Sequence, residues 1–378
     1  MKTFIASRNK KLLYRALSLH QHRLRDRRVP RAALQDPKES SWKQLYSSQN
    51  DQALITFTGF DFGTFQWLAS LFVPIHDQYK PFSKDGKIKK LVHVGEGPGR
   101  TRLMSGIDCL ALTLAWTRTR GSTMVLQMIF GITASSVSTY LRFGCRILIM
   151  VLSGQAEARL EVPCAEKIQE YKDSDKAKYE LLDNVWCCMD GLKLTLQQAG
   201  DNTIQNMFYN GWTHDHYVTG VYVFCPDGTI PIATYNVPGS FHDSKIANLG
   251  KIYEKLEVQF EQHQGICVAD SAFCRKEKDY IIVSGKHLGI EDPVEKERNR
   301  QATSMRQSAE WGMRALQASF PRLKDRSIYE EKGERRLILK SILLLYNVRA
   351  RKVGINQIRN TFFPNLEREV GHDVLCLI

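Results

Sequence analysis

Three acidic residues that are far apart in the sequence have the types and settings that phosphodiester chemistry requires. Asp190 ends a short apolar run that begins at Val185, and Asp270 ends a similar run. Glu310 lies inside the helical pattern of residues 304–319. Apolar runs of this length are typical of buried strands, and a strand is a rigid support for a carboxylate. The pattern predicts an acidic site built from two strand ends and one helix.

Carboxylates suit this chemistry because a nuclease must activate water and stabilise charge on the leaving oxygen. Two divalent cations about 3.5–4 Å apart supply both effects, and Mg²⁺ prefers oxygen ligands. In this hypothesis Asp190 bridges two Mg²⁺ or Mn²⁺ ions, while Asp270 and Glu310 each favour one. Taken singly, a strand-end Asp is commonly a turn or cap residue and a helical Glu a solvated charge. The order of the three acids on these elements carries the hypothesis.

Basic residues flank the third acid. Arg306 and Arg314 lie four residues before and after Glu310, on the same helix face. They are candidates for contacts with DNA phosphates or for holding the carboxylate in place. Simple ion pairs within the helix are the alternative.

Other polar groups are weaker metal candidates. Asp243 lies in the segment 238–244, where an Asp at a helix start readily caps the helix, although it is expected near the site. The alternating His214, Asp215 and His216 are typical of surface or pairing positions that enter a strand. The sequence has no glycine-rich phosphate loop and no recognisable Ser-His-Asp arrangement.

The charge of the chain favours a polyanionic partner. The net charge is +13, and ten Lys or Arg lie among the first 32 residues. This basic arm is predicted to touch DNA phosphates or to direct the protein to the nucleus. The alternatives are an ordinary basic surface and a solvated tail.

The composition is that of a globular protein, with 43% apolar and 25% charged residues. No apolar run reaches roughly 18 residues, so no membrane span is expected, and the N-terminus lacks a secretory signal pattern. The nine cysteines form no CxxC pair and several lie in apolar runs. We expect reduced core thiols in an intracellular protein.

A helix-turn-helix pattern precedes the acidic residues. A short helix over 123–129, a turn containing Gly131 and a helix over 134–152 with Thr133 as N-cap are predicted. Apolar residues of the longer helix share one face, namely Val137, Leu141, Leu148 and Leu152. The residues expected to face DNA are Ser135, Ser136, Ser138, Thr139 and Arg142. A helical bundle without DNA contacts is the alternative.

The remaining elements predict an α/β (α+β) protein: a ribonuclease-H-like catalytic core after an all-helical, helix-turn-helix-like domain. Strands over 217–224 and 230–235 follow the Asp190 strand, and a helix then precedes the Asp270 strand. This order gives three antiparallel strands and a parallel fourth. Residues 284–303 are expected to be irregular, and an apolar helix over 337–348 should pack behind the sheet.

The sequence divides into four predicted regions. They are a basic arm and linker (1–50), the helical domain (51–175), the catalytic domain (176–363) and a C-terminal tail (364–378).

Short motifs in a fixed order make the chain resemble the PIF/Harbinger group of DDE transposases and the nucleases derived from them. The motifs lie at residues 115–121, 130–133, 189–191, 209–211, 226–228, 238–240, 242–244, 269–273, 306, 310 and 320–323. The family usually has Gly-Asp-x-x-Tyr where this chain has Ala269-Asp270-Ser271-Ala272-Phe273, and a basic residue is frequent at the position of Gln317. The acid is kept, so the chemistry is expected to be kept.

The resemblance implies a ribonuclease-H-like core, Mg²⁺ dependence, double-stranded transposon-end DNA as substrate and a separate Myb-like partner protein. We also expect a homo-oligomer. The expected function is hydrolysis at the element end, followed by attack of the freed 3′-hydroxyl on target DNA. A domesticated protein that binds DNA without cleaving it, and another ribonuclease-H-like nuclease, are the alternatives.

Overall fold

The structure is a computed structural model that describes residues 29–81, 89–91, 102–198, 200–273, 278–285, 292–326 and 332–363. Most of the predicted basic arm and the predicted C-terminal tail lie outside these residues.

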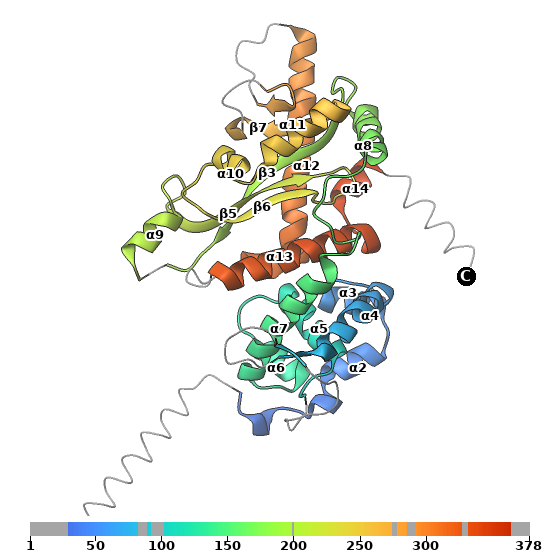
Figure 1. Ribbon diagram of the computed structural model, residues 1–378, viewed down its shortest axis with the longest axis vertical. Coiled ribbons are helices and arrows are strands. Elements are labelled where there is room, and N and C mark those ends of the chain that lie inside the picture. Colours follow the sequence, from blue (N-terminus) through green and yellow to red (C-terminus); the bar gives the residue numbers. More distant parts are fainter. Residues whose placement is uncertain are drawn as a thin grey trace, which may run out of the picture.

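A mixed sheet forms the centre of the C-terminal half (Figure 1). Its strands are β3 (Val185–Thr195), β4 (Tyr209–Asn210), β5 (Asp215–Phe224), β6 (Ile232–Pro238), β7 (Ile266–Asp270) and β8 (Ile281–Ser284). Strands β3, β5 and β6 pair antiparallel, while β7 pairs parallel to β3 and β8 pairs parallel to β7. The predicted hairpin and the predicted parallel strand are therefore present, in a mixed α/β fold.

Helices cover both faces of the sheet. On one face, α12 (Pro293–Ser319) crosses β3 and its neighbours, and α13 (Lys332–Val348) lies against β6. On the other face are α8 (Ala165–Lys178), α10 (Asp243–Leu249) and α11 (Ile252–His263) (Figure 1). Successive residues of β3 enter two different cores: Cys188 and Leu192 pack on the α12 side, and Met189 packs on the α11 side. This alternation determines on which face of the sheet each β3 side chain lies.

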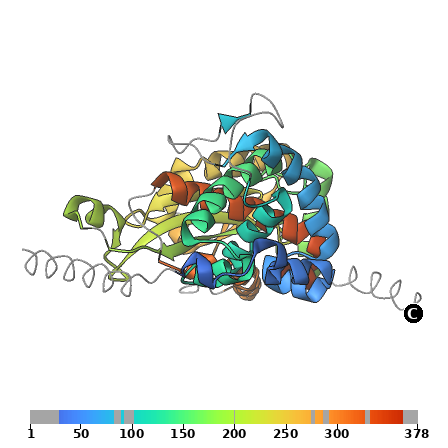
Figure 2. The same cartoon turned by 90° about the horizontal axis from the view of Figure 1, so that it is seen from below.

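A helical bundle lies beneath α13, as Figures 1 and 2 show. It comprises α2 (Ser41–Ser47), α3 (Asp51–Thr58), α4 (Phe62–Gln78), α5 (Gly106–Arg118), α6 (Met124–Phe130) and α7 (Ala134–Leu152). Helix α13 packs on α7 as well as on the sheet, as predicted for this apolar segment. Smaller elements are η1 (Arg31–Ala33), η2 (Pro37–Glu39), β1 (Tyr79–Lys80), β2 (Lys89–Lys90), α9 (Asn202–Phe208), η3 (Ser271–Phe273), η4 (Pro321–Lys324), η5 (Arg349–Val353) and α14 (Gln357–Phe362).

The segment expected to be a linker instead contains α2, which belongs to the bundle core. Trp42 is 1% exposed, and its ring lies 5.8 Å from that of Phe130 and 6.0 Å from that of Phe57. Its indole N–H donates to Asp108 at 2.9 Å. Leu45 and Tyr46 also pack against the bundle core. Lys43 pairs with Asp108 at 2.8 Å, so tertiary contacts hold this helix.

Helix α7 has the predicted bounds and the predicted apolar face. Val137, Leu141, Leu148 and Leu152 are all buried. Thr133 occupies the N-cap position but makes no side-chain capping bond; its hydroxyl lies 3.1–3.2 Å from the hydroxyls of neighbouring serines instead. By length and composition alone α7 passes for a membrane span, yet it packs against α4, α5 and α13.

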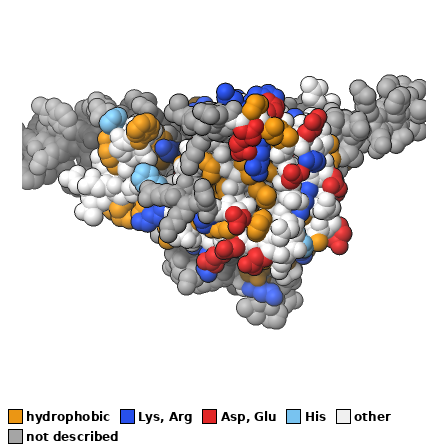
Figure 3. Space-filling model, turned by 90° about the horizontal axis from the view of Figure 1, so that it is seen from above, with side chains coloured by type: hydrophobic (Ala, Val, Ile, Leu, Met, Phe, Trp, Pro, Cys, Tyr) orange, Lys and Arg blue, Asp and Glu red, His pale blue; other side chains and the backbone are white. Residues whose placement is uncertain are grey.

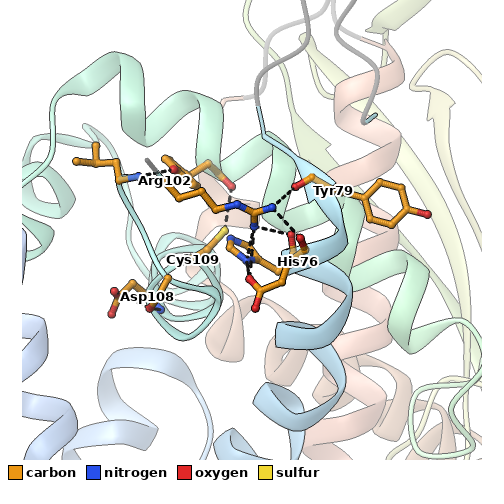
Figure 4. A network of polar contacts seen from close by, with 9 residues as sticks. His76, Tyr79, Arg102, Asp108 and Cys109 are labelled. Atoms are coloured by element: carbon orange, nitrogen blue, oxygen red, sulfur yellow. Dashed lines mark hydrogen bonds and ion pairs between the residues drawn. The ribbon is translucent and has the colours of Figure 1, made fainter. Parts of the chain in front are cut away.

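Arg102 closes the C-terminal end of α4 (Figure 4). Its guanidinium donates to the backbone oxygens of His76 (2.7 Å), Asp77 (3.0 Å) and Tyr79 (2.8 Å). Carbonyls in a last helical turn lack partners within the helix, so the arginine satisfies them. Burial lowers the pKa of the His76 ring, which lies against Phe143. The Arg102 contacts therefore join the segment before α5 to the C-terminal end of α4.

Helix α12 is longer than the sequence indicated, because residues 293–303 are helical rather than irregular. Asp292 accepts a hydrogen bond from the backbone N–H of Val294, and Pro293 occupies the first turn. Ion pairs between residues three apart stabilise this charged half, as in the pair of Glu297 with Arg300.

Candidate active site

Asp190 and Asp270 lie side by side on adjacent parallel strands. The last register pair between β3 and β7 is Met189 with Ala269, so the two aspartates follow at the same level. Both point to the α12 face, because side chains alternate along a strand and Cys188 and Val268, two residues earlier, pack in the α12 core.

The position of Asp190 within its strand differs from the prediction. Asp190 lies in the middle of β3, which continues to Thr195 because β5 pairs with it along its whole second half. Asp270, by contrast, ends β7 as predicted. The two carboxylates therefore lie at the end of β7, where its pairing with β3 stops, while β3 itself continues to Thr195.

Asp243 is a third acid of this region, although the sequence favoured a capping role for it. Its carboxyl atoms lie 2.6–2.7 Å from the place where a Cβ on Gly191 would be. Asp243 is the first residue of α10, after the N-cap residue His242. Only a glycine at position 191 leaves room for a carboxyl group directly against β3, on the face opposite to the Asp190 carboxylate. The Asp-Gly pair of β3 was the sequence signal that could have found this contact.

Burial raises the pKa of Asp190 to about 6. The backbone N–H of Gly191 (2.7 Å) and the Arg306 guanidinium oppose this rise in pKa, while the charges of Asp270 and Asp243 add to it. Burial also raises the pKa of Asp243, and Asp270 contributes there too. Asp270 accepts hydrogen bonds from the backbone N–H (2.6 Å) and hydroxyl (3.2 Å) of Ser271. The carboxylates of Asp190 and Asp270 therefore lie close enough to repel each other on one face of the sheet, and Asp243 acts on both from the opposite face of β3.

Glu310 lies on α12, the helix that packs on the face of the two strand aspartates. Its carboxylate is 3.2 Å from the guanidinium of Arg306 and is about one third exposed. Because Arg306 also acts on the charge of Asp190, this arginine links the helical acid to the strand acids. Within the described residues, no three His, Cys, Asp or Glu side chains gather as a ready metal group. Arg314 is exposed.

The residues predicted to face DNA from α7 are partly engaged in the protein. Ser135 and Arg142 are exposed, and Ser136 is half-buried. The hydroxyl of Thr139 donates to the Ser135 backbone oxygen at 2.9 Å, and Arg142 lies 3.8 Å from Glu334 of α13. Their role in DNA contact stays a prediction.

The alternating segment at the start of β5 has structural partners. Asp215 pairs with Arg326 at 2.9 Å, and His216 is buried. The backbone N–H of His216 and then the Arg326 side chain lower the pKa of Asp215. His214 has a left-handed backbone in the preceding turn, with φ of 54°.

The fold is a mixed α/β domain that brings acidic side chains together, and a comparison with family models indicates its class. Residues 189–347 match the family model described as DDE superfamily endonuclease. This span contains all four acids and supports a DDE superfamily endonuclease domain, which suggests a transposase or nuclease type of function. Such domains generally use divalent metal ions, and DNA is the substrate that the family implies. Neither the curated proteins nor the solved structures compared with the chain gave a match.

Proposed function

We propose that the protein is a DDE-type transposase or endonuclease that cleaves DNA at transposon ends and joins the freed 3′-hydroxyl to target DNA. The single observation that carries the proposal is the pairing of Asp190 with Asp270 on adjacent parallel strands, facing the helix of Glu310. The matched family model covers all three positions.

The donor set fits divalent cations. Mg²⁺ and Mn²⁺ take carboxylate oxygens, and crowded carboxylates that raise one another's pKa bind a cation with a gain in electrostatic energy. Asp190 and Asp270 would hold two ions, with Glu310 as a third ligand and Asp243 adjacent. Glu310 reaches that role once its carboxylate leaves Arg306. When bound, the ions supply charge neutralisation and an activated water.

The side chains of this chain have separate tasks in the proposed reaction. Asp190 must be ionised, which its pKa of about 6 allows above mildly acidic pH. The Gly191 and Ser271 backbone N–H groups orient the carboxylates of Asp190 and Asp270. Arg306 is placed to offer positive charge to a scissile phosphate. Water attacks the phosphorus and the bond to the 3′-oxygen breaks, which leaves a 3′-hydroxyl and a 5′-phosphate. That hydroxyl then attacks a phosphorus of the target strand, which forms a new phosphodiester and releases the target's 3′-oxygen as a hydroxyl.

The test is nicking of supercoiled plasmid DNA in Mg²⁺ or Mn²⁺. Asp190→Asn and Asp270→Asn should lower the rate by about 1,000-fold or more while the proteins stay folded. Asp183→Asn is the matched control, because that carboxylate is 73% exposed and, among the described residues, pairs with Lys176. Cleavage that persists in EDTA or in Asp190→Asn refutes the proposal.

A second candidate function is DNA binding without cleavage. The ion pair of Arg306 with Glu310 favours it, because it leaves the helical acid outside the carboxylate cluster. A Mn²⁺ titration separates the two functions. An inert DNA-binding protein binds duplex DNA but shows no nicking at any Mn²⁺ concentration.

We further infer a ribonuclease-H-like enzyme of the PIF/Harbinger type, acting in the nucleus as a homo-oligomer with a Myb-like partner. The three antiparallel strands followed by a parallel fourth support the fold, and the net charge of +13 supports DNA as the partner. Light scattering tests the oligomer, and a reporter fused to residues 1–50 tests nuclear import.

A further inference from the structure

Trp212 is held in solvent beside the acidic site. It lies in the turn between β4 and β5 and is 90% exposed. Within the described residues it makes no ring contact, whereas Tyr209 lies 5.4 Å from the His216 ring and Phe241 lies 4.3 Å from Lys245 Nζ. Other large apolar side chains of the same segment are also exposed, namely Ile204, Met207 and Tyr209. A group of exposed apolar side chains marks a surface that binds a partner.

The turn that carries Trp212 is fixed rather than loosely attached. The side-chain oxygen of Asn210 accepts from the backbone N–H groups of Trp212 (3.2 Å) and Thr213 (3.2 Å). The amide group of Asn210 donates to the Gly239 backbone oxygen at 2.9 Å, which ties the turn to the segment after β6. A Cβ on Gly239 would lie 2.6 Å from a β5 backbone oxygen, so the two segments are in close contact. The indole is thus presented from a preorganised support.

A pocket of about 570 Å³ lies between this turn, α10 and the end of β7. It combines aromatic rings, basic side chains and one acid, namely Tyr209, Trp212, Phe241, Lys193, His242 and Asp243. Figure 3 shows apolar and His side chains exposed at the left end of the molecule, the side on which Figure 1 labels α9. Side chains alternate along β3, so Asp243 over Gly191 lies on the face opposite to the Asp190 carboxylate. The pocket adjoins the acidic site through Ser271 and Ala272, which directly follow Asp270.

We propose that this pocket binds one unstacked nucleobase of the DNA strand at the cleavage site, with Trp212 stacked on its face. The inference rests on the proposed function, since it names how the same site holds its substrate. A flat aromatic ring stacks on any base, and enzymes that act within a duplex commonly draw one nucleotide out into such a pocket. Lys193 is exposed on β3 and lies where it can meet the phosphate of that nucleotide.

The experiment measures binding of full-length protein to short duplexes that carry one unpaired 2-aminopurine, without divalent ions. Stacking on Trp212 should quench the fluorescence of the unpaired base. Trp212→Ala should remove the quenching and raise Kd by about 5- to 150-fold. Trp212→Phe should keep most of the quenching and most of the affinity, since phenylalanine retains an aromatic ring. For a fully paired duplex, the Kd of Trp212→Ala and of Trp212→Phe should equal that of the wild type.

Ile355→Ala is the matched control, because Ile355 is 57% exposed and lies outside the pocket. Unchanged binding of unpaired-base DNA by Trp212→Ala overturns the proposal. Equal weakening for paired and unpaired DNA also overturns it, because Trp212 is then a general contact. A change of oligomeric state in Trp212→Ala assigns the surface to a second copy instead. Asp190→Asn separates this proposal from the nuclease proposal, since it should keep base stacking and lose cleavage.

Discussion

Asp190→Asn should stabilise the metal-free protein at neutral pH, although it should destroy activity. Burial and two neighbouring carboxylates raise the pKa of Asp190 from 3.8 to about 6. The folded state therefore holds a proton that the unfolded chain has already lost between pH 3.8 and 6. Stability contributed by this group falls as the pH rises through that window and stays low above it.

The size of the effect follows from the same pKa difference. Each pKa unit corresponds to about 1.4 kcal/mol, so the ionised Asp190 carboxylate costs at most about 3 kcal/mol of folding free energy above pH 6. Asparagine has nearly the same shape without the charge. The variant should equal the wild type near pH 4 and exceed it by up to about 3 kcal/mol at pH 7.5.

The assay is urea denaturation in EDTA from pH 4 to 8, with the unfolding free energy compared at each pH. Asp215→Asn is the opposite control, because the pKa of Asp215 is lowered and its loss should destabilise the protein at neutral pH. Adding Mn²⁺ should stabilise the wild type and leave Asp190→Asn unchanged. A difference between Asp190→Asn and wild type that does not depend on pH refutes the electrostatic reasoning.

Three further perturbations test the packing around the site. Arg306→Ala removes a positive charge from beside Asp190, so the midpoint pH for Mn²⁺ stabilisation in thermal unfolding should move up; an unchanged midpoint speaks against that contact. Gly191→Ala should cost about 1–3 kcal/mol in chemical denaturation, and adding Asp243→Ala should recover most of it, because the new Cβ would meet that carboxyl at 2.6 Å. Full additivity of the two changes contradicts the contact. Gly312→Ala should destabilise by a similar amount, although alanine favours helix, since its Cβ would lie 2.5 Å from a β5 aromatic ring; a gain in stability means that α12 does not press on the sheet there.

Local patterns were sufficient for most elements. Helix α7 and the strands that carry Asp190 and Asp270 are found where the apolar runs predicted them. Their signal is strong because burial of an apolar face dictates the spacing along the chain. The charged half of α12 and helix α2 were missed, because neither has a long repeating apolar face. Ion pairs stabilise the former, and Trp42 with its neighbours packs the latter on the bundle core.

The sequence by itself determined the types of the acids, their order and the strands and helix that carry Asp190, Asp270 and Glu310. Only the tertiary structure decided which acids meet. Strand register brings the two aspartates to one level, and the missing side chain of Gly191 admits Asp243. The ion pair with Arg306 holds Glu310 apart. These are contacts between residues distant in sequence, and their distances depend on packing that no local pattern encodes.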